Sequence, residues 1–308
     1  MYPMLLLCHD SEGEEQRVDF NFNPEVCKNV FLLSGRDTGE SSVKSGDFAG
    51  LGINEVLRRL GGEEEETRGL PIYIRHINTS SRSPVKVYPG DEYAALHSDG
   101  KGKKSLFYIV DALEGAEMVY GLSRSVSPDE LNRRATSGSL SAICNFVNVQ
   151  KGDVFYVPEG VVFAVGGGIS AVEVSINSDN EFVIADYRRT DESGSPRPVQ
   201  LTRALEVMSH KKINIAYGNI GDLTLYPFGT VRELAKTEIF SVEEINVDGN
   251  MGVYEESDSV SLIVISGEAD VSYSTGTIHL KAGNSVFIPK GIRIRLSGKA
   301  QFLYTRFR

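Results

Sequence analysis

The sequence predicts an all-β protein built from two similar barrels of antiparallel strands, with a small helical insert in the first barrel. Short runs of alternating or fully apolar side chains dominate, turn residues separate them, and one motif occurs twice. The 308 residues suffice for two ordinary domains with substantial cores. We expect a first domain over residues 1–200, and a linking helix with a second domain over 201–308.

Strands are expected where short apolar or alternating runs lie between Gly, Asp, Asn and Pro. The run Met1–Cys8 is interpreted as a first strand and not as a signal peptide, because no basic segment precedes its apolar residues and acidic residues follow at once. The other clear runs are Leu70–Asn78, Leu106–Ala112, Glu117–Leu122, Asp153–Val157, Ala171–Ile176 and Ser261–Ile265.

Helical periodicity is confined to a few segments. Gly52–Gly61 places its apolar residues on one helical face. The insert at about 127–140 begins with Ser127 as N-cap, a proline in the first turn and a glutamate at N3. Leu201–Ser209 follows a proline-rich loop and is expected to be the linking helix. The acidic run Glu63–Glu66 is expected to be a solvated loop without chemistry.

One motif occurs in both halves of the chain. It reads Gly-Asp-Val-Phe-Tyr-Val-Pro-Glu-Gly at 152–160 and Gly-Asn-Ser-Val-Phe-Ile-Pro-Lys-Gly at 283–291, which is 131 residues later (283 minus 152). That spacing indicates a duplicated domain, since it is too long for a solenoid repeat. The first glycine supplies the positive φ of a tight turn, and the proline ends the strand. The motif is typical of the second half of a cupin signature, so we expect two cupin (jelly-roll) barrels.

Composition and charge exclude several classes of protein. The formal net charge of −10 and the pI near 5.1 disfavour nucleic acid and anionic membranes as partners, although a local basic pocket can still bind a phosphorylated metabolite. No apolar stretch approaches the roughly 18 residues of a membrane span. Three cysteines without Cys-x-x-Cys spacing, Cys8, Cys27 and Cys144, indicate a reduced, cytoplasmic protein.

Four further stretches occur in a fixed order. They read Pro-Val-Lys-Val-Tyr-Pro-Gly-Asp-Glu-Tyr-Ala at 84–94, Gly-Lys-Lys-Ser-Leu-Phe-Tyr-Ile-Val-Asp-Ala at 102–112, Val-Pro-Glu-Gly-Val-Val-Phe-Ala at 157–164 and Glu-Val-Ser-Ile-Asn-Ser-Asp at 173–179. Together they resemble the type I mannose-6-phosphate isomerases of the cupin superfamily, over about residues 40–308. The resemblance implies a zinc site in the first barrel and an aldose–ketose isomerisation of sugar phosphates.

The zinc-ligand positions depart from that family. Carried over residue by residue, the two ligands in the first stretch are Lys86 and Tyr88 here. The ligands of the second and third stretches are Ser105 and Phe163. Zinc prefers imidazole, thiolate or carboxylate, and none of these four side chains supplies one. A later arginine of the family is Val183 here. We therefore expect no zinc and no other cofactor.

Each changed position allows two interpretations. Tyr88 and Phe163 either fill the barrel mouth or form a stacking face for a sugar ring. Lys86 is either a rim lysine or a cation in the former metal position, where it could hold a phosphate or stabilise an enediolate. Lys103 matches a family lysine implicated in catalysis, and is otherwise one of the exposed lysines of the segment 101–104.

The histidines offer little evidence for a displaced metal site. None of the five stands at ligand spacing from another. His97 and Glu92, close to the first stretch, are the pair from which a relocated site could be built, and this is disfavoured. His76 alternates with Arg75 along its strand and is expected to be packed or paired.

The resemblance and the departures define the candidate site and the candidate functions. The proposed substrate-binding residues are Lys86, Tyr88, Ser105, Phe163 and Glu173, with Lys103 as the catalytic candidate. The lost ligands favour a homologue that binds a sugar phosphate or related anion without isomerising it, in a regulatory or sensing role. The alternative is an active isomerase of mannose 6-phosphate and fructose 6-phosphate with relocated or no metal ligands. A purely structural or oligomerising cupin comes third, and a homodimer is a fold-level expectation.

Overall fold

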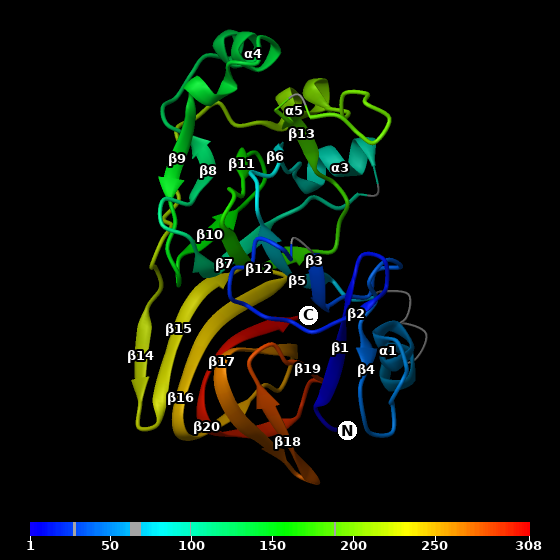
Figure 1. The fold of residues 1–308 in the computed structure, drawn as a ribbon. Coiled ribbons are helices and arrows are strands. Elements are labelled where there is room, and N and C mark those ends of the chain that lie inside the picture. Colours follow the sequence, from blue (N-terminus) through cyan, green and yellow to red (C-terminus); the bar gives the residue numbers. More distant parts are fainter. Residues whose placement is uncertain (27–28, 62–68, 99, 188) are drawn as a thin grey trace.

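The computed structural model describes residues 1–26, 29–61, 69–98, 100–187 and 189–308. Strands dominate and form two barrels, with the first above the second in Figure 1. The prediction of an all-β fold with two jelly-roll barrels and a small helical insert is confirmed. The predicted domain boundary at residue 200 stays a prediction.

The N-terminal segment lies beside both barrels and packs one helix against the sheet. Its elements are β1 (Met4–Asp10), β2 (Glu15–Gln16), β3 (Asn29–Leu33), β4 (Ser42–Val43) and α1 (Ile53–Gly61). The expected first strand is thus present as β1. Cys27 and the acidic run Glu63–Glu66 lie outside the residues that the structure describes.

The first barrel contains most of the helical residues. Its elements are β5 (Ile72–Thr79), β6 (Val85–Val87), α3 (Asp91–His97), β7 (Ser105–Ala112), β8 (Glu117–Leu122), α4 (Pro128–Thr136), η1 (Leu140–Ala142), β9 (Cys144–Asn148), β10 (Val154–Val157), β11 (Phe163–Ala164), β12 (Ile169–Ile176) and β13 (Phe182–Ala185). The Ser127 hydroxyl accepts a hydrogen bond from the Glu130 N–H, 3.2 Å away, which confirms the predicted N-cap of α4.

The second barrel follows the linking helix α5 (Leu201–Val207), which ends two residues earlier than predicted. Its strands are β14 (Leu223–Tyr226), β15 (Gly229–Lys236), β16 (Phe240–Tyr254), β17 (Ser259–Tyr273), β18 (Gly276–Lys281), β19 (Ser285–Ile288) and β20 (Arg293–Phe307). The strands β16, β17 and β20 are long, with 15 residues each.

One continuous sheet runs through both barrels. Its order is β10-β7-β12-β5-β3-β1-β19-β17-β20-β16-β15-β14, so β1 joins the barrels by pairing with β3 on one side and β19 on the other. A smaller sheet, β13-β6-β11-β8-β9, closes the first barrel from the opposite side. We call the part of the first barrel that β5, β6, β7, β12 and β13 surround its mouth.

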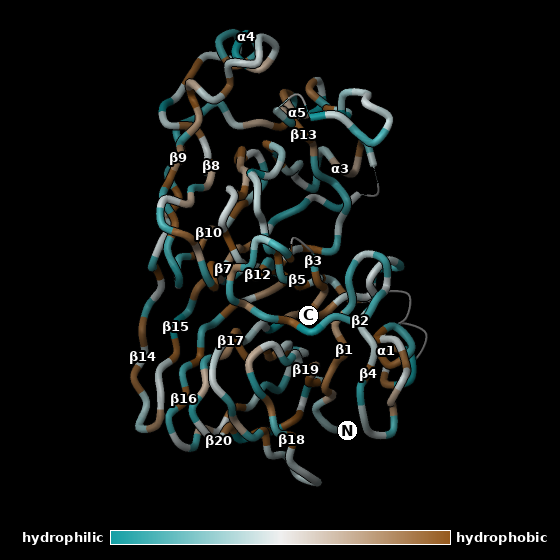
Figure 2. Tube along the Cα trace, viewed as in Figure 1, coloured by the Kyte–Doolittle hydropathy of each residue, from teal (hydrophilic) through white to brown (hydrophobic). Residues whose placement is uncertain are grey.

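Apolar side chains form separate cores on each side of these sheets. One fills the first barrel, with Phe107, Phe155 and Ile169, and one fills the second barrel around Leu262 and Leu296. A third joins the barrels, and a fourth lies beneath α4 and α5. Part of α4 is coloured as hydrophilic in Figure 2, and its apolar residues Leu131 and Ala135 are buried. Among the described residues, no helix has the length and apolar character that a membrane crossing needs.

The duplicated motif adopts the same turn in both barrels. Gly152 and Gly283 both have φ of 88°, a conformation that suits glycine. The strands that follow, β10 and β19, occupy matching positions along the motif. The predicted duplication is therefore visible in the backbone as well as in the sequence.

Candidate functional site

The candidate site lies inside the first barrel near its mouth. Side chains alternate between the faces of a strand, so β5 directs Tyr73 and Arg75 inward with Ile77 of the barrel core. On β6, Val85 and Val87 pack outward beneath the helices. Lys86 and Tyr88 consequently face inward, as predicted from the two-residue period.

Glu173 on β12 is the most deeply buried charged residue of the site. Its carboxylate accepts a hydrogen bond from Arg75 Nε at 2.6 Å and from Ser105 Oγ at 2.9 Å, and the Tyr88 hydroxyl lies 3.4 Å away. Burial alone raises the pKa of Glu173, but Arg75 and Lys103 outweigh it and hold the pKa below its usual value. Glu173 is therefore an ionised, fully hydrogen-bonded anchor.

Glu181 is the second carboxylate of the site and lies between two lysines. Lys103 Nζ is 3.2 Å from one of its oxygens and Lys86 Nζ contacts the other. Burial raises the pKa of Glu181, but Lys103 and Lys86 outweigh it and lower the pKa to about 2. Glu181 keeps 27% of its side chain exposed, so it is the carboxylate that a ligand can reach.

Lys103 is buried, with only 4% of its side chain exposed, so the interpretation of Lys103 as an exposed lysine is wrong. Its ammonium lies 5.2 Å from the centre of the Tyr88 ring and 5.6 Å from that of Tyr73. Burial lowers the pKa of Lys103, whereas Tyr73, Glu181 and Glu173 raise it, and the net direction is upward. Lys103 is therefore cationic at neutral pH.

The charged layer of the site is formed by Arg75, Lys86, Lys103, Glu173 and Glu181. Tyr88 and Phe163 pack against each other below this layer, with ring centres 4.8 Å apart. Phe163 also contacts Phe107, at 5.7 Å between ring centres. Only 1% of Tyr88 and 4% of Phe163 is exposed. A stacking face for a sugar ring would need an accessible ring, so their placement favours the filling interpretation.

The residues at the four positions that the resemblance assigns to zinc ligands do not fit zinc. Lys86 offers an ammonium and Phe163 a phenyl ring, which supply no lone pair. Burial and Glu173 raise the pKa of the Tyr88 hydroxyl well above its usual value, so it stays neutral, and Ser105 is engaged with Glu173. Over the described part of the chain, no three His, Cys, Asp or Glu side chains converge as a metal site would need.

The structure also shows where His76, His97 and Val183, the residue aligned with the family arginine, are located. His76 is buried, contacts Ser170 Oγ at 2.7 Å and has a pKa lowered to about 4 by burial, as expected for a packed strand histidine. His97 lies on the surface and stacks on Tyr93, while Glu92 is exposed. Val183 pairs with Lys86 across the β6–β13 ladder.

Two contributors to this layer, Arg75 and Glu181, were not among the predicted site residues. The two-residue period of β5 already placed Arg75 on the same face as Tyr73 and Ile77. Glu181 lies directly before β13 and two residues before Val183, which the resemblance aligns with a family arginine. Strand periodicity combined with the family motif could have identified both residues.

A family model and curated relatives that match this chain all carry the description mannose-6-phosphate isomerase. Residues 230–306 match the family model described as the mannose-6-phosphate isomerase cupin domain, within the predicted second domain. Mannose-6-phosphate isomerase ManA of Bacillus subtilis is 30% identical over 280 residues, covering 88% of this chain and 86% of that protein. The mannose-6-phosphate isomerase of Streptococcus mutans is 25% identical and covers 91% and 89%.

Solved structures show the same fold. The crystal structure of mannose 6-phosphate isomerase from Bacillus subtilis superposes with a TM-score of 0.86 at 23% identity, covering 99% of both chains. A zinc-bound mannose 6-phosphate isomerase superposes with a TM-score of 0.78 at 11% identity, again over 99% of both. The relatives support the isomerase alternative better than the non-catalytic interpretation favoured by the lost ligands.

Proposed function

The chain belongs to the mannose-6-phosphate isomerase family, and on that premise we propose that it interconverts an aldose phosphate and a ketose phosphate in its first barrel. Mannose 6-phosphate and fructose 6-phosphate are the proposed pair, since the relatives carry that name. The observation that carries the proposal is the charged layer at the barrel mouth, where buried Lys103 faces the accessible carboxylate Glu181.

The reaction moves one proton between neighbouring carbons of the open-chain sugar. A base removes the proton from C2, the electrons pass to the C1 carbonyl oxygen, and an enediolate forms. Returning the proton to C1 gives the ketose. The base must be ionised and reachable, and Glu181 meets both conditions, whereas Glu173 is sealed beneath it.

Protein cations stabilise the enediolate in this proposal. Lys103 is fixed by burial and by two aromatic rings, so its charge is in place before the substrate arrives. It donates a proton to O1 as the charge develops and accepts one from O2 as the ketose forms. Arg75 adds positive charge from the same layer through its pair with Glu173. The donor set does not fit zinc, and no step requires a metal.

The substrate also changes the basicity of Glu181. Without a ligand, Lys86 and Lys103 hold the pKa of Glu181 near 2, which makes it a weak base. Sugar oxygens that accept hydrogen bonds from these lysines draw the ammonium groups away from Glu181 and raise its pKa toward the ordinary carboxyl value. Glu181 thus becomes the stronger base when the substrate is present.

A non-catalytic binding module is the second candidate function. The filling of the former metal positions by Tyr88 and Phe163 supports it, because a binder needs the cations and not the metal. In this role Lys86 and Lys103 would hold a sugar phosphate or related anion, and no proton transfer would follow.

Turnover of mannose 6-phosphate by chelator-treated, metal-analysed protein tests the proposal. Isomerase activity is expected to persist in EDTA. Lys103→Met is expected to lower kcat about 10²–10³-fold, because it removes a preorganised charge. Lys104→Met is the matched control, since Lys104 pairs with Glu159 at 3.5 Å near the surface.

Two results would change this assignment. Binding of mannose 6-phosphate without turnover would replace the isomerase with the binding module. Stoichiometric zinc together with activity that EDTA abolishes would overturn the metal-independent mechanism.

A further inference from the structure

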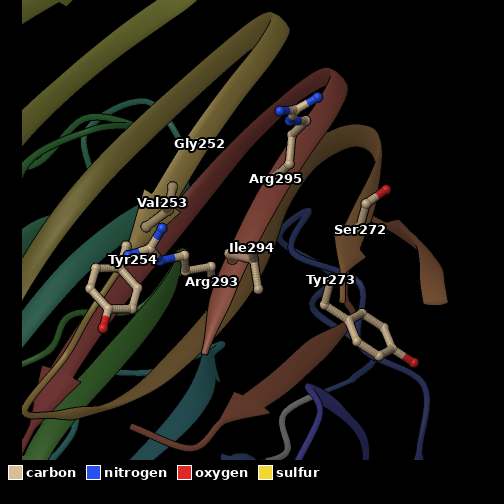
Figure 3. A pocket seen from close by; sticks show the side chains of 8 residues that line it. All are labelled: Gly252, Val253, Tyr254, Ser272, Tyr273, Arg293, Ile294 and Arg295. Atoms are coloured by element: carbon tan, nitrogen blue, oxygen red, sulfur yellow. The ribbon is translucent and has the colours of Figure 1, made fainter. Parts of the chain in front are cut away.

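A hollow of about 700 Å³ lies on the second barrel, away from the first-barrel site (Figure 3). Three neighbouring strands line it, with β20 in the middle. Tyr254 of β16 lies opposite Arg293 of β20, and Ser272 of β17 lies opposite Arg295. Arg293 and Arg295 are two residues apart on one strand and therefore share the outer face of the sheet, as their exposure indicates.

These two arginines differ from the other charged residues on the same sheet face. Further along, Lys299 pairs with Asp248 at 3.3 Å and His279 contacts Asp270 at 2.9 Å. Neither Arg293 nor Arg295 has an acidic group within 4.0 Å among the residues that the structure describes. In a chain with a net charge of −10, this end of the sheet thus carries two arginines for which the described residues form no ion pair.

The neighbouring side chains leave the guanidinium groups accessible and partly oriented. Arg295 is flanked by Gly252 and Ser272, and a Cβ atom built at Gly252 would meet nothing within 4 Å. The Arg293 guanidinium lies 4.6 Å from the centre of the Tyr254 ring, which limits its motion. Figure 3 shows Arg293 beside Tyr254, and Arg295 farther along the same strand beside Ser272.

We propose that this hollow is a second anion-binding site, which takes the phosphate group of a small phosphorylated sugar. Guanidinium groups match phosphate oxygens with paired N–H donors, and Arg293 and Arg295 present two of them on one face. The Tyr254 ring offers an apolar surface for the sugar, whereas the Ser272 hydroxyl already shares a hydrogen bond of 3.0 Å with the Thr277 hydroxyl. The site lies outside the first barrel and does not depend on its chemistry.

Calorimetric titration of mannose 6-phosphate into the full chain tests the site. The double variant Lys86→Met and Lys103→Met serves as the background, because these two lysines are the cations that would hold a phosphate in the first barrel, so that binding there does not mask the second site. One equivalent is expected to bind. The double change Arg293→Gln and Arg295→Gln is expected to weaken this binding at least tenfold. Lys299→Gln, on the same strand and face, is expected to change it less than twofold.

Three ligands define the chemistry of the site. Inorganic phosphate is expected to compete with mannose 6-phosphate, unphosphorylated mannose is not, and gluconate is expected to bind more weakly because its anion is a carboxylate. Absence of binding at about 10 mM, or an equal loss in Lys299→Gln, would overturn the proposal. Equal binding of gluconate would contradict the preference for phosphate. Because the background lacks both Lys86 and Lys103, failure here leaves the proposed isomerase unaffected.

The outer edge of the continuous sheet carries an independent inference. β14 pairs with β15 on one side only, so about half of its backbone N–H and C=O groups face outward. All four of its residues are exposed, including Leu223 and Leu225, the latter with 74% of its surface accessible. Figure 2 shows hydrophobic residues along β14.

We propose that two copies of this chain dimerise by antiparallel pairing of their β14 strands. Such pairing about a two-fold axis places Leu223 of one copy opposite Tyr226 of the other and satisfies the free backbone groups of both. The segment 223–231 contains no charged residue, so two copies that each carry −10 can meet there without direct like-charge contacts.

Sedimentation velocity over a range of protein concentrations tests this interface. The wild-type chain is expected to sediment as a dimer, and Leu225→Lys or Leu223→Lys as a monomer, because each places a charge on the pairing edge of both copies. Leu96→Lys is the control, since Leu96 is 81% exposed on α3, far along the chain from β14. A monomeric wild-type chain, or a dimer that persists in both β14 variants, would refute the interface.

Discussion

The two barrels share a turn and a strand register but differ in what they hold beneath their mouths. In the first barrel, Ser105 pairs with Val157 and Phe107 with Glu173. In the second, the same places along the duplicated motif pair Val260 with Ile288 and Leu262 with Tyr304. The pairing registers therefore make Val260 the counterpart of Ser105 and Tyr304 the counterpart of Glu173.

The difference separates what the scaffold needs from what the site needs. The second barrel closes with an apolar residue and a tyrosine at these places, so neither the hydroxyl of Ser105 nor the carboxylate of Glu173 is required to build the fold. A fully buried ionised carboxylate has a large desolvation cost and is seldom retained for stability alone. The charged layer of the first barrel is therefore best explained by ligand binding or catalysis.

The largest expected effect comes from removing the buried carboxylate. Glu173→Leu leaves Arg75 without its ion-pair partner, and we expect a loss of about 3–5 kcal/mol in the free energy of unfolding. Chemical denaturation measures it. Glu243→Leu is the second-barrel control, since its partner Arg306 is partly exposed and the expected loss is below about 2 kcal/mol. Equal losses would contradict the contrast between the barrels.

A cavity in the second barrel should lower stability without touching the chemistry. Leu296 is fully buried in the core of that barrel, and Leu296→Ala is expected to cost about 2–4 kcal/mol. The kcat for mannose 6-phosphate is expected to stay within twofold of wild type at a temperature where both proteins are folded. A large drop in kcat would show that the second barrel takes part in the reaction.

Acid should weaken the first barrel through Glu181. Its pKa is about 2 in the folded chain against 4.5 for the ordinary carboxyl, so its contribution is complete above pH 4.5 and is lost as the pH falls through 2. The shift corresponds to about 3 kcal/mol at most. As the pH is lowered from 5 to 2, the free energy of unfolding is expected to fall less steeply in Glu181→Gln than in wild type. Parallel curves would contradict the assignment.

The smallest expected effect concerns the helix that only the first barrel contains. Ser127 caps α4, and Ser127→Ala is expected to cost about 1 kcal/mol. Hydrogen exchange should speed up in α4 and stay unchanged in β17 and β20. Uniformly faster exchange would indicate that the helix stabilises both barrels and not one.

The fold could be predicted because its strongest signals are local in sequence. The duplicated Gly-to-Gly motif, the cap at Ser127 and the strand alternation each depend on a few neighbouring residues. The site was predicted in part, since the family motifs located Lys103 and Glu173. The pairing of Glu173 with Arg75, and of Glu181 with two lysines, joins residues that lie 70 or more positions apart in the sequence. The sequence also does not show which lysine of the segment Lys101–Lys104 is buried, because the burial of Lys103 depends on equally distant residues. Only the folded chain reveals these contacts.

The placement of β1 between the barrels has a consequence for biosynthesis. Met4 of β1 pairs with Phe287 of β19, so a strand made early must wait until almost all of the intervening chain has left the ribosome. Until then its edge toward β19 stays open. We expect nascent chains to depend on chaperones during this interval, and the first barrel to become resistant to proteases only after β19 has been translated.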